Sequence, residues 1–194
     1  SAVALTDHNT IDGLGEFLNA AKGKDIEVVP GAEFSVDYKG TELHLLGLFI
    51  PESAFPKISG LMAEFNARKE KSNIDLVAAL NCDGYAIDYS EIRAKSPKGT
   101  INRAHIAAEL LKKGYVESIG QAFERLLSKT GGYYVEPKRL TVWEMIDVIN
   151  EIGAVPVLAH PFLNLSEEEL SEFLPLAKER GLKGMECYYS SYDE

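Results

Sequence analysis

Residues 2–8 read Ala2-Val3-Ala4-Leu5-Thr6-Asp7-His8, an apolar run that ends in three polar side chains. A continuous apolar run of this kind is typical of a strand buried on both faces. A helix is predicted from Thr10 to Ala21, with Gly23 ending it. Further strand-like runs follow at residues 26–29 and 43–50. This strand–helix–strand order predicts the parallel sheet of an α/β protein or barrel.

The order changes between residues 55 and 140, where helical patterns follow one another and no convincing strand is found. The alternation of strands and helices returns after residue 140. There, capping boxes at Thr141/Glu144 and Ser166/Glu169 predict helix starts. We therefore expect an α/β domain from residues 1–57 and 141–194, interrupted by an all-helical insertion at 58–140. Within the insertion, helices are predicted near 59–80, from Thr100 to about Gly114, and after the capping box Ser118/Gln121; the returning strands are predicted at 155–159 and 185–189.

The composition excludes several classes of protein. The chain has 194 residues, 45% of them apolar, and a formal net charge of −10. No apolar run approaches the roughly 20 residues of a membrane helix, and the acidic surface argues against an extended basic track for nucleic acid. Cys82 and Cys187 are far apart, which favours a reduced, cytoplasmic protein. The chain begins without Met inside a strand-like run, so we expect it to be an excerpt of a longer protein.

Four residues suggest a metal site: His8, Glu33, His44 and His160. Each lies at the end of a strand-like run or inside one, and the strand ends of an α/β barrel meet on the face where active sites form. Imidazoles and a carboxylate are the ligands expected for Zn²⁺, Mn²⁺ or Fe²⁺, and Asp7 is placed to orient an imidazole. A single histidine at a strand end is more often structural, so it is the repetition that favours metal binding.

The same segments resemble the PHP family (polymerase and histidinol phosphatase). Residues 6–14, 30–35, 42–47 and 157–161 resemble four of its motifs in family order. The resemblance implies a distorted (β/α)7 barrel, incomplete in this chain because the opening and closing motifs have no counterpart. It implies a hydrolase of phosphoesters with up to three divalent ions (Mn, Fe or Zn). The implied metal ligands are His8, Glu33, His44 and His160, and the implied catalytic residues are Asp7, His8 and Glu33.

The insertion resembles that of the stand-alone nucleotide phosphatases within this family. The matching positions are Arg68 with Lys71, and Arg103 with His105, which implies that all four bind substrate phosphate. Thr100 is expected to cap the helix that carries Arg103, leaving free backbone N–H groups near the phosphate. Helix-borne Arg and Lys side chains usually face water, so a solvated surface is the alternative for Arg68 and Lys71; Lys98 is expected to be solvated.

The favoured function is therefore metal-dependent hydrolysis of a phosphomonoester. The expected substrate is a nucleotide, a nucleoside bisphosphate or the end of a short oligonucleotide. One alternative is a phosphatase of the histidinol-phosphate type. The other is a PHP module without activity that belongs to a larger protein, such as a DNA polymerase.

Overall fold

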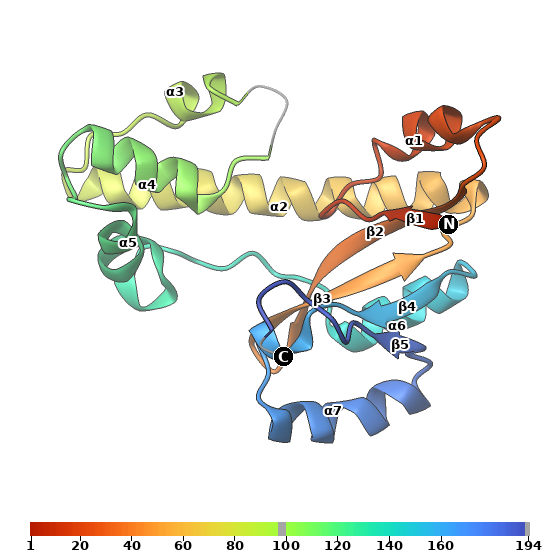
Figure 1. The fold of residues 1–194 in the computed structure, drawn as a ribbon. Helices are drawn as coiled ribbons and strands as arrows, with labels where there is room; N and C mark the ends of the chain where they lie inside the picture. Colours follow the sequence, from red (N-terminus) through yellow and green to blue (C-terminus); the bar gives the residue numbers. More distant parts are fainter. Residues whose placement is uncertain (97–99, 193–194) are drawn as a thin grey trace. The chain divides into compact units, whose positions relative to one another are not determined.

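The structure, a computed structural model, describes residues 1–96 and 100–192 (Figure 1). Lys98 lies outside these ranges. The chain forms two compact units, one made of residues 1–62 with 139–194 and the other of residues 63–138. Whether the boundaries expected at 57/58 and 140/141 separate two independent domains stays a prediction. No helix in the described part of the chain is both long and apolar enough to cross a membrane.

The first unit is built on a five-stranded sheet whose strands follow one another in the order of the sequence. Apolar side chains of the sheet and of the helices α1, α6 and α7 form its core. The strands are β1 (Ala2–Leu5), β2 (Glu27–Tyr38), β3 (Thr41–Leu48), β4 (Val155–Leu158) and β5 (Gly184–Met185), and the helices are α1 (Leu14–Ala21), α6 (Val142–Glu151) and α7 (Glu167–Glu179), with 3₁₀ turns at Glu52–Ala54 and Pro161–Leu163.

The sheet is mixed. The prediction of a parallel sheet was therefore wrong for the central strands. β1 pairs with β2 and β4 with β5 in parallel, but β2–β3 and β3–β4 are antiparallel. The reason lies at Lys39 and Gly40, which have φ values of +53° and +84°. Two central residues with positive φ form the turn whose twist matches a hairpin. With five strands in the described residues, the closed seven-stranded barrel stays a prediction.

The β2–β3 hairpin separates a core face from a polar face, because alternate side chains of a strand point to opposite sides. Ala32, Phe34 and Val36 of β2 are buried, as are Leu43 and Leu45 of β3. The residues between them, which include Glu33, Ser35, Glu42 and His44, therefore share the opposite face. Glu33 and His44 thus lie inside long strands, whereas Glu33 was expected to follow a strand that ends at Val29.

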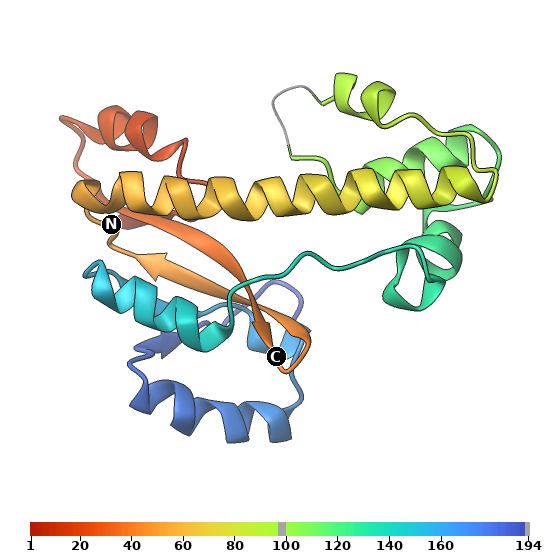
Figure 2. The ribbon, with the colours of Figure 1, turned by 180° about the vertical axis from the view of Figure 1, so that it is seen from behind.

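The second unit is helical, and no strand occurs among its described residues. Figure 2 shows α3, α4 and α5 near the C-terminal half of the long helix α2. Leu76, Leu80, Ile106 and Leu110 are central to its apolar core. The helices are α2 (Phe55–Cys82), which begins in the first unit, α3 (Tyr89–Ala94), α4 (Arg103–Lys112) and α5 (Ile119–Ala122), followed by a π-helical turn at Phe123–Leu127 and a 3₁₀ turn at Lys129–Gly131.

Several predicted helix and strand ends differ from the structure. α1 begins at Leu14, because Thr10 caps only a turn through the Asp12 N–H. α4 is capped by Asn102 instead of Thr100. The last strand is Gly184–Met185 and not 185–189. The capping boxes at Thr141/Glu144 and Ser166/Glu169 are confirmed, with both reciprocal hydrogen bonds present.

Candidate metal centre

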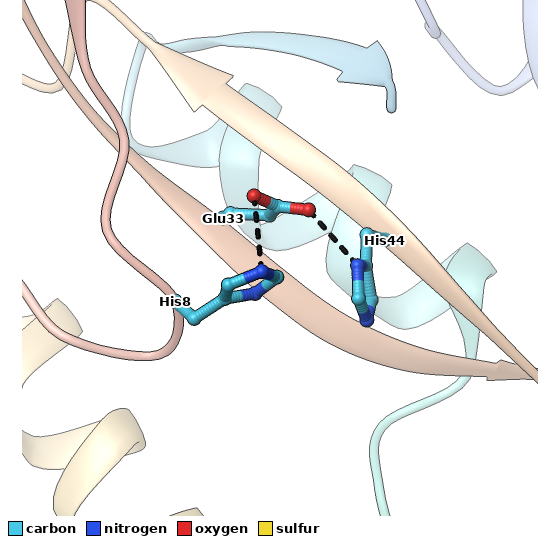
Figure 3. Close-up of side chains that lie close together, drawn as sticks. All are labelled: His8, Glu33 and His44. Carbon is cyan, nitrogen blue, oxygen red and sulfur yellow. Dashed lines mark ion pairs between the residues drawn. The ribbon is translucent and has the colours of Figure 1, made fainter. Parts of the chain in front are cut away.

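The Glu33 carboxylate lies at the centre of three imidazole rings. Its Oε1 atom is 2.9 Å from Nδ1 of His44 and 2.9 Å from Nε2 of His160, and its Oε2 atom is 3.5 Å from Nε2 of His8. Figure 3 shows the His8 ring facing one oxygen of this carboxylate and the His44 ring facing the other. Ligand-type atoms of His8, Glu33 and His44 all lie within 4.8 Å of one another. The structure thus brings together the four residues that the sequence singled out.

His8 reaches Glu33 because the loop after β1 continues to pair with β2. The Asn9 N–H donates to the Glu33 carbonyl at 2.8 Å, and the Glu33 N–H donates to the Asp7 carbonyl at 3.1 Å. The Asn9 side chain bonds both the hydroxyl and the N–H of Ser35. Asn9 has a φ of +51°, a conformation that asparagine tolerates better than most residues. These bonds hold His8 beside Glu33 while 59% of its side chain stays exposed.

His160 is buried and sits in an unusual backbone conformation just after β4. Its φ of +25° and ψ of +58° lie outside the common regions for residues with a side chain. The His160 N–H donates to the Glu186 carboxylate at 2.8 Å, and the preceding Ala159 N–H donates to the His44 carbonyl at 3.0 Å. Strained residues of this kind concentrate at functional sites, where surrounding contacts hold them.

The electrostatics of the cluster favour a charged carboxylate among the rings. Burial raises the pKa of Glu33, but hydrogen bonds to His44 and His160 outweigh it and hold the pKa below its usual value. Burial lowers the pKa of His44, yet contacts with Glu33 and Glu42 raise it to about 9. Burial lowers the pKa of His8; Glu33 partly opposes this, and the His44 and His160 rings add to it. Without a metal ion, a proton on His44 therefore compensates the Glu33 charge.

These residues fit a divalent transition-metal ion. Two nitrogens and one oxygen are separated by 2.9, 2.9 and 3.1 Å, the last being the distance from His44 Nδ1 to His160 Nε2. Nitrogen and oxygen ligands of such ions lie about 2.0–2.2 Å from the metal, so three donor atoms this close together could hold one ion. The Nδ1 atom of His160 is buried and, within the described residues, has no hydrogen-bond partner. The donor set is the one that Zn²⁺, Mn²⁺ and Fe²⁺ prefer.

The sequence analysis missed two charged residues that support His44. Glu42 Oε1 lies 3.6 Å from His44 Nε2, and Arg139 Nη2 donates to Glu42 Oε2 at 2.7 Å. Burial raises the pKa of Glu42, but His44 and Arg139 lower it to about 2. Glu42 could have been found, because it stands two residues before His44 in a strand and so shares its face. Arg139 was expected to belong to the insertion, whereas the structure places it in the first unit, and no local pattern in the sequence links it to the site.

The Asp7 carboxylate was expected to orient an imidazole. Among the described residues, the Asp7 carboxylate makes no hydrogen bond to the His8 ring; Asp7 joins the site through its carbonyl, which accepts from Glu33.

The four expected phosphate-binding residues all belong to the second unit, where each has an intramolecular partner. Arg68 pairs with Glu64, and Lys71 pairs with Asp75 at 2.6 Å. Arg103 donates to the Leu127 carbonyl at 2.8 Å, and its guanidinium lies 4.1 Å from the centre of the Tyr134 ring. His105 accepts from the Asn102 N–H and so completes the N-terminal cap of α4. Of the four, Arg68 and Lys71 are exposed, whereas Arg103 and His105 are partly buried.

The chain is similar to several known proteins. The sequence profile of the PHP domain matches residues 1–139. A 5'-3' exoribonuclease of Haemophilus influenzae is 30% identical over 96% of this chain and 68% of its own length. A 3',5'-nucleoside bisphosphate phosphatase of Chromobacterium violaceum is 29% identical over 82% of this chain and 56% of its own length.

Solved structures show the same fold. A proposed metal-dependent phosphoesterase of Bifidobacterium adolescentis has a TM-score of 0.73 and 27% identity, covering 95% of this chain and 66% of that protein. An amidohydrolase of Chromobacterium violaceum, solved with sulfate and without metal, has a TM-score of 0.76 at 24% identity, covering 95% and 65%. The chain therefore spans roughly half to two thirds of the length of these proteins.

Proposed function

We propose, because this chain belongs to the PHP domain family, that the whole protein is a metal-dependent phosphoesterase acting on nucleotides. The substrate would be a phosphomonoester of a nucleotide, a nucleoside bisphosphate or the end of a short oligonucleotide. One observation carries the proposal: the Glu33 carboxylate is surrounded by the rings of His8, His44 and His160. The names of two relatives, an exoribonuclease and a nucleoside bisphosphate phosphatase, support the nucleotide class.

His8, Glu33, His44 and His160 would hold divalent ions of manganese, iron or zinc, up to three in the whole protein. When bound, such ions polarise phosphoryl oxygens and lower the pKa of a coordinated water. Glu33 places a negative charge between the rings, and His160 is the buried member of the cluster. His8 is the most exposed of the four side chains, so the reactive phosphate would approach from its side. Asp7 stays in the proposed catalytic set because its carbonyl fixes the backbone of Glu33.

Phosphate recognition by the second unit is the finer part of the proposal. Arg103 uses one guanidinium nitrogen on the Leu127 carbonyl and stacks on Tyr134, which leaves donors for a ligand phosphate. Arg68, Lys71 and His105 are proposed as further phosphate contacts. Arg103→Ala should lower kcat/KM about ten- to hundredfold for a substrate with two phosphates. An aryl monophosphate should be hydrolysed nearly as before, and equal losses on both substrates would assign Arg103 a structural role.

The experiment that tests the function measures metal content and hydrolysis on the same samples of the longest natural form of the protein. Metal-stripped protein is reloaded with Mn²⁺, Fe²⁺ or Zn²⁺ and given a 3',5'-nucleoside bisphosphate, a 5'-phosphorylated oligonucleotide and histidinol phosphate. Phosphate release from a nucleotide substrate, lost in Glu33→Gln, is the expected result. A preference for histidinol phosphate would support the first alternative. Bound metal without hydrolysis of any substrate would support a module without activity.

A further inference from the structure

A chain of charged contacts approaches the metal centre from the side away from Glu33. Arg139 Nη2 donates to one oxygen of Glu42 at 2.7 Å, and the other oxygen of Glu42 lies 3.6 Å from Nε2 of His44. The opposite ring nitrogen of His44, Nδ1, is the atom 2.9 Å from Glu33. The imidazole of His44 is thus held between two carboxylates, one on each nitrogen.

We propose that Glu42 and Arg139 are positioning residues that fix the orientation and the tautomer of His44 for metal binding. The negative charge of Glu42, 3.6 Å from Nε2, favours the tautomer that carries hydrogen on that nitrogen, because a carboxylate attracts an N–H and repels a lone pair. That tautomer leaves the lone pair of Nδ1 directed at the proposed metal. Acidic groups that orient metal-binding histidines in this way typically matter ten- to hundredfold for metal affinity. The inference rests on the proposed function, because it needs a metal to bind at Glu33.

Arg139 is needed because Glu42 alone is not confined. The Glu42 side chain is 37% exposed, so it has room to turn towards solvent, whereas the Arg139 side chain is only 8% exposed. The backbone after Arg139 is tied to the end of β2: the Asp37 N–H donates to the Leu140 carbonyl at 2.9 Å, and Asp37 forms a parallel bridge with Thr141. Arg139 therefore has a fixed position from which its guanidinium holds one oxygen of Glu42.

A purely stabilising ion pair is a weaker explanation. Burying a guanidinium costs desolvation energy that one carboxylate seldom recovers, so a buried pair is weak evidence for added stability. The same unit contains a second Arg–carboxylate pair for comparison. Arg180 bonds Asp147 through two nitrogens, at 3.0 and 2.5 Å, with both side chains about half exposed. The Arg180–Asp147 pair has the same chemistry but no contact with His44, which makes it a matched control.

The experiment measures Mn²⁺ affinity by calorimetry, together with the absorption spectrum of the Co²⁺-loaded protein. Glu42→Gln keeps the size of the side chain and removes its charge, and Arg139→Ala removes the group that holds Glu42. Both should weaken Mn²⁺ binding about ten- to hundredfold and shift the Co²⁺ bands. Arg139→Lys should restore part of the affinity. Asp147→Asn should bind Mn²⁺ within about threefold of wild type, with an unchanged Co²⁺ spectrum.

The outcomes separate this inference from the proposed function. A wild-type protein that binds no Mn²⁺, Zn²⁺ or Fe²⁺ would refute the proposed function itself. Wild-type binding with the same affinity and Co²⁺ spectrum in Glu42→Gln would overturn only the role of Glu42 and Arg139. Equal losses of affinity in Glu42→Gln and Asp147→Asn would also overturn it, because any ion pair would then have the same effect. Circular dichroism and the melting temperature of each variant identify unfolding as a cause of lost binding.

Discussion

The Nδ1 atom of His44 lies 3.1 Å from the Nε2 atom of His160, although the two residues are 116 positions apart. Both nitrogens are also 2.9 Å from the same oxygen of Glu33. If both nitrogens donate to that oxygen, their protons crowd each other. If only one is protonated, the other turns a lone pair towards the carboxylate. A cation bound by all three atoms removes this conflict.

Metal addition should therefore stabilise the protein. A metal at one hundred times its dissociation constant adds about 2.7 kcal/mol to the free energy of unfolding. The measurement is urea unfolding of chelator-treated protein with and without Mn²⁺ or Zn²⁺. His44→Ala should lose most of the increment, and Asp147→Asn should keep it. An equal increment in His44→Ala would place the metal elsewhere.

The metal-free protein should lose stability as the pH is raised from 6 to 10. The pKa of His44 is raised from 6.5 to about 9 in the folded state. The stabilisation from its proton is therefore complete below about pH 6.5 and is lost as the pH passes 9, an effect on the order of 3 kcal/mol at most. Urea unfolding at intervals of pH measures it. In His44→Gln the decline should flatten, and an unchanged decline would assign it to other groups.

Glu186 lies outside the strands, but it should contribute both to the stability of the protein and to metal binding. Its carboxylate accepts the N–H of His160, whose backbone has a φ of +25°. Glu186→Ala leaves that N–H unsatisfied and should cost about 1–3 kcal/mol in unfolding free energy. It should also weaken metal binding, because His160 is then free to leave its strained conformation. The exposed Glu179→Ala, on α7 in the same unit, is the control and should change both quantities little.

The cap of α4 gives a direct test of the corrected helix start. Asn102 accepts hydrogen bonds from the N–H groups of Ala104 and His105. Asn102→Ala should lower the unfolding free energy by about 1 kcal/mol, and Thr100→Ala should lower it much less. Thermal unfolding followed by circular dichroism compares the two. A larger loss in Thr100→Ala would return the cap to the position that the sequence analysis favoured.

The sequence allowed the site to be predicted better than the sheet that carries it. His8, Glu33, His44 and His160 could be singled out because chemistry limits which residues bind a metal. The hairpin was missed because Pro30 and Gly31 interrupt the alternating pattern of β2, which resembles a short strand followed by a loop. Asn102 was passed over because Thr100 is also a capping residue by type, and only the structure shows that the helix begins at Arg103. Arg139 depends on tertiary pairing with β2, for which no local pattern exists.

The turn at Lys39 and Gly40 has a consequence for how the protein folds during synthesis. It joins the two strands that carry Glu33 and His44 into one local hairpin, and hairpins of this kind form within microseconds. His160 must instead close a loop of 116 residues, which costs about 2 kcal/mol more chain entropy than closing the hairpin. On a ribosome, three of the four residues, His8, Glu33 and His44, thus emerge long before His160 exists. A nascent chain would present a three-residue site of lower affinity first, and high affinity would arise only when β4 joins the sheet.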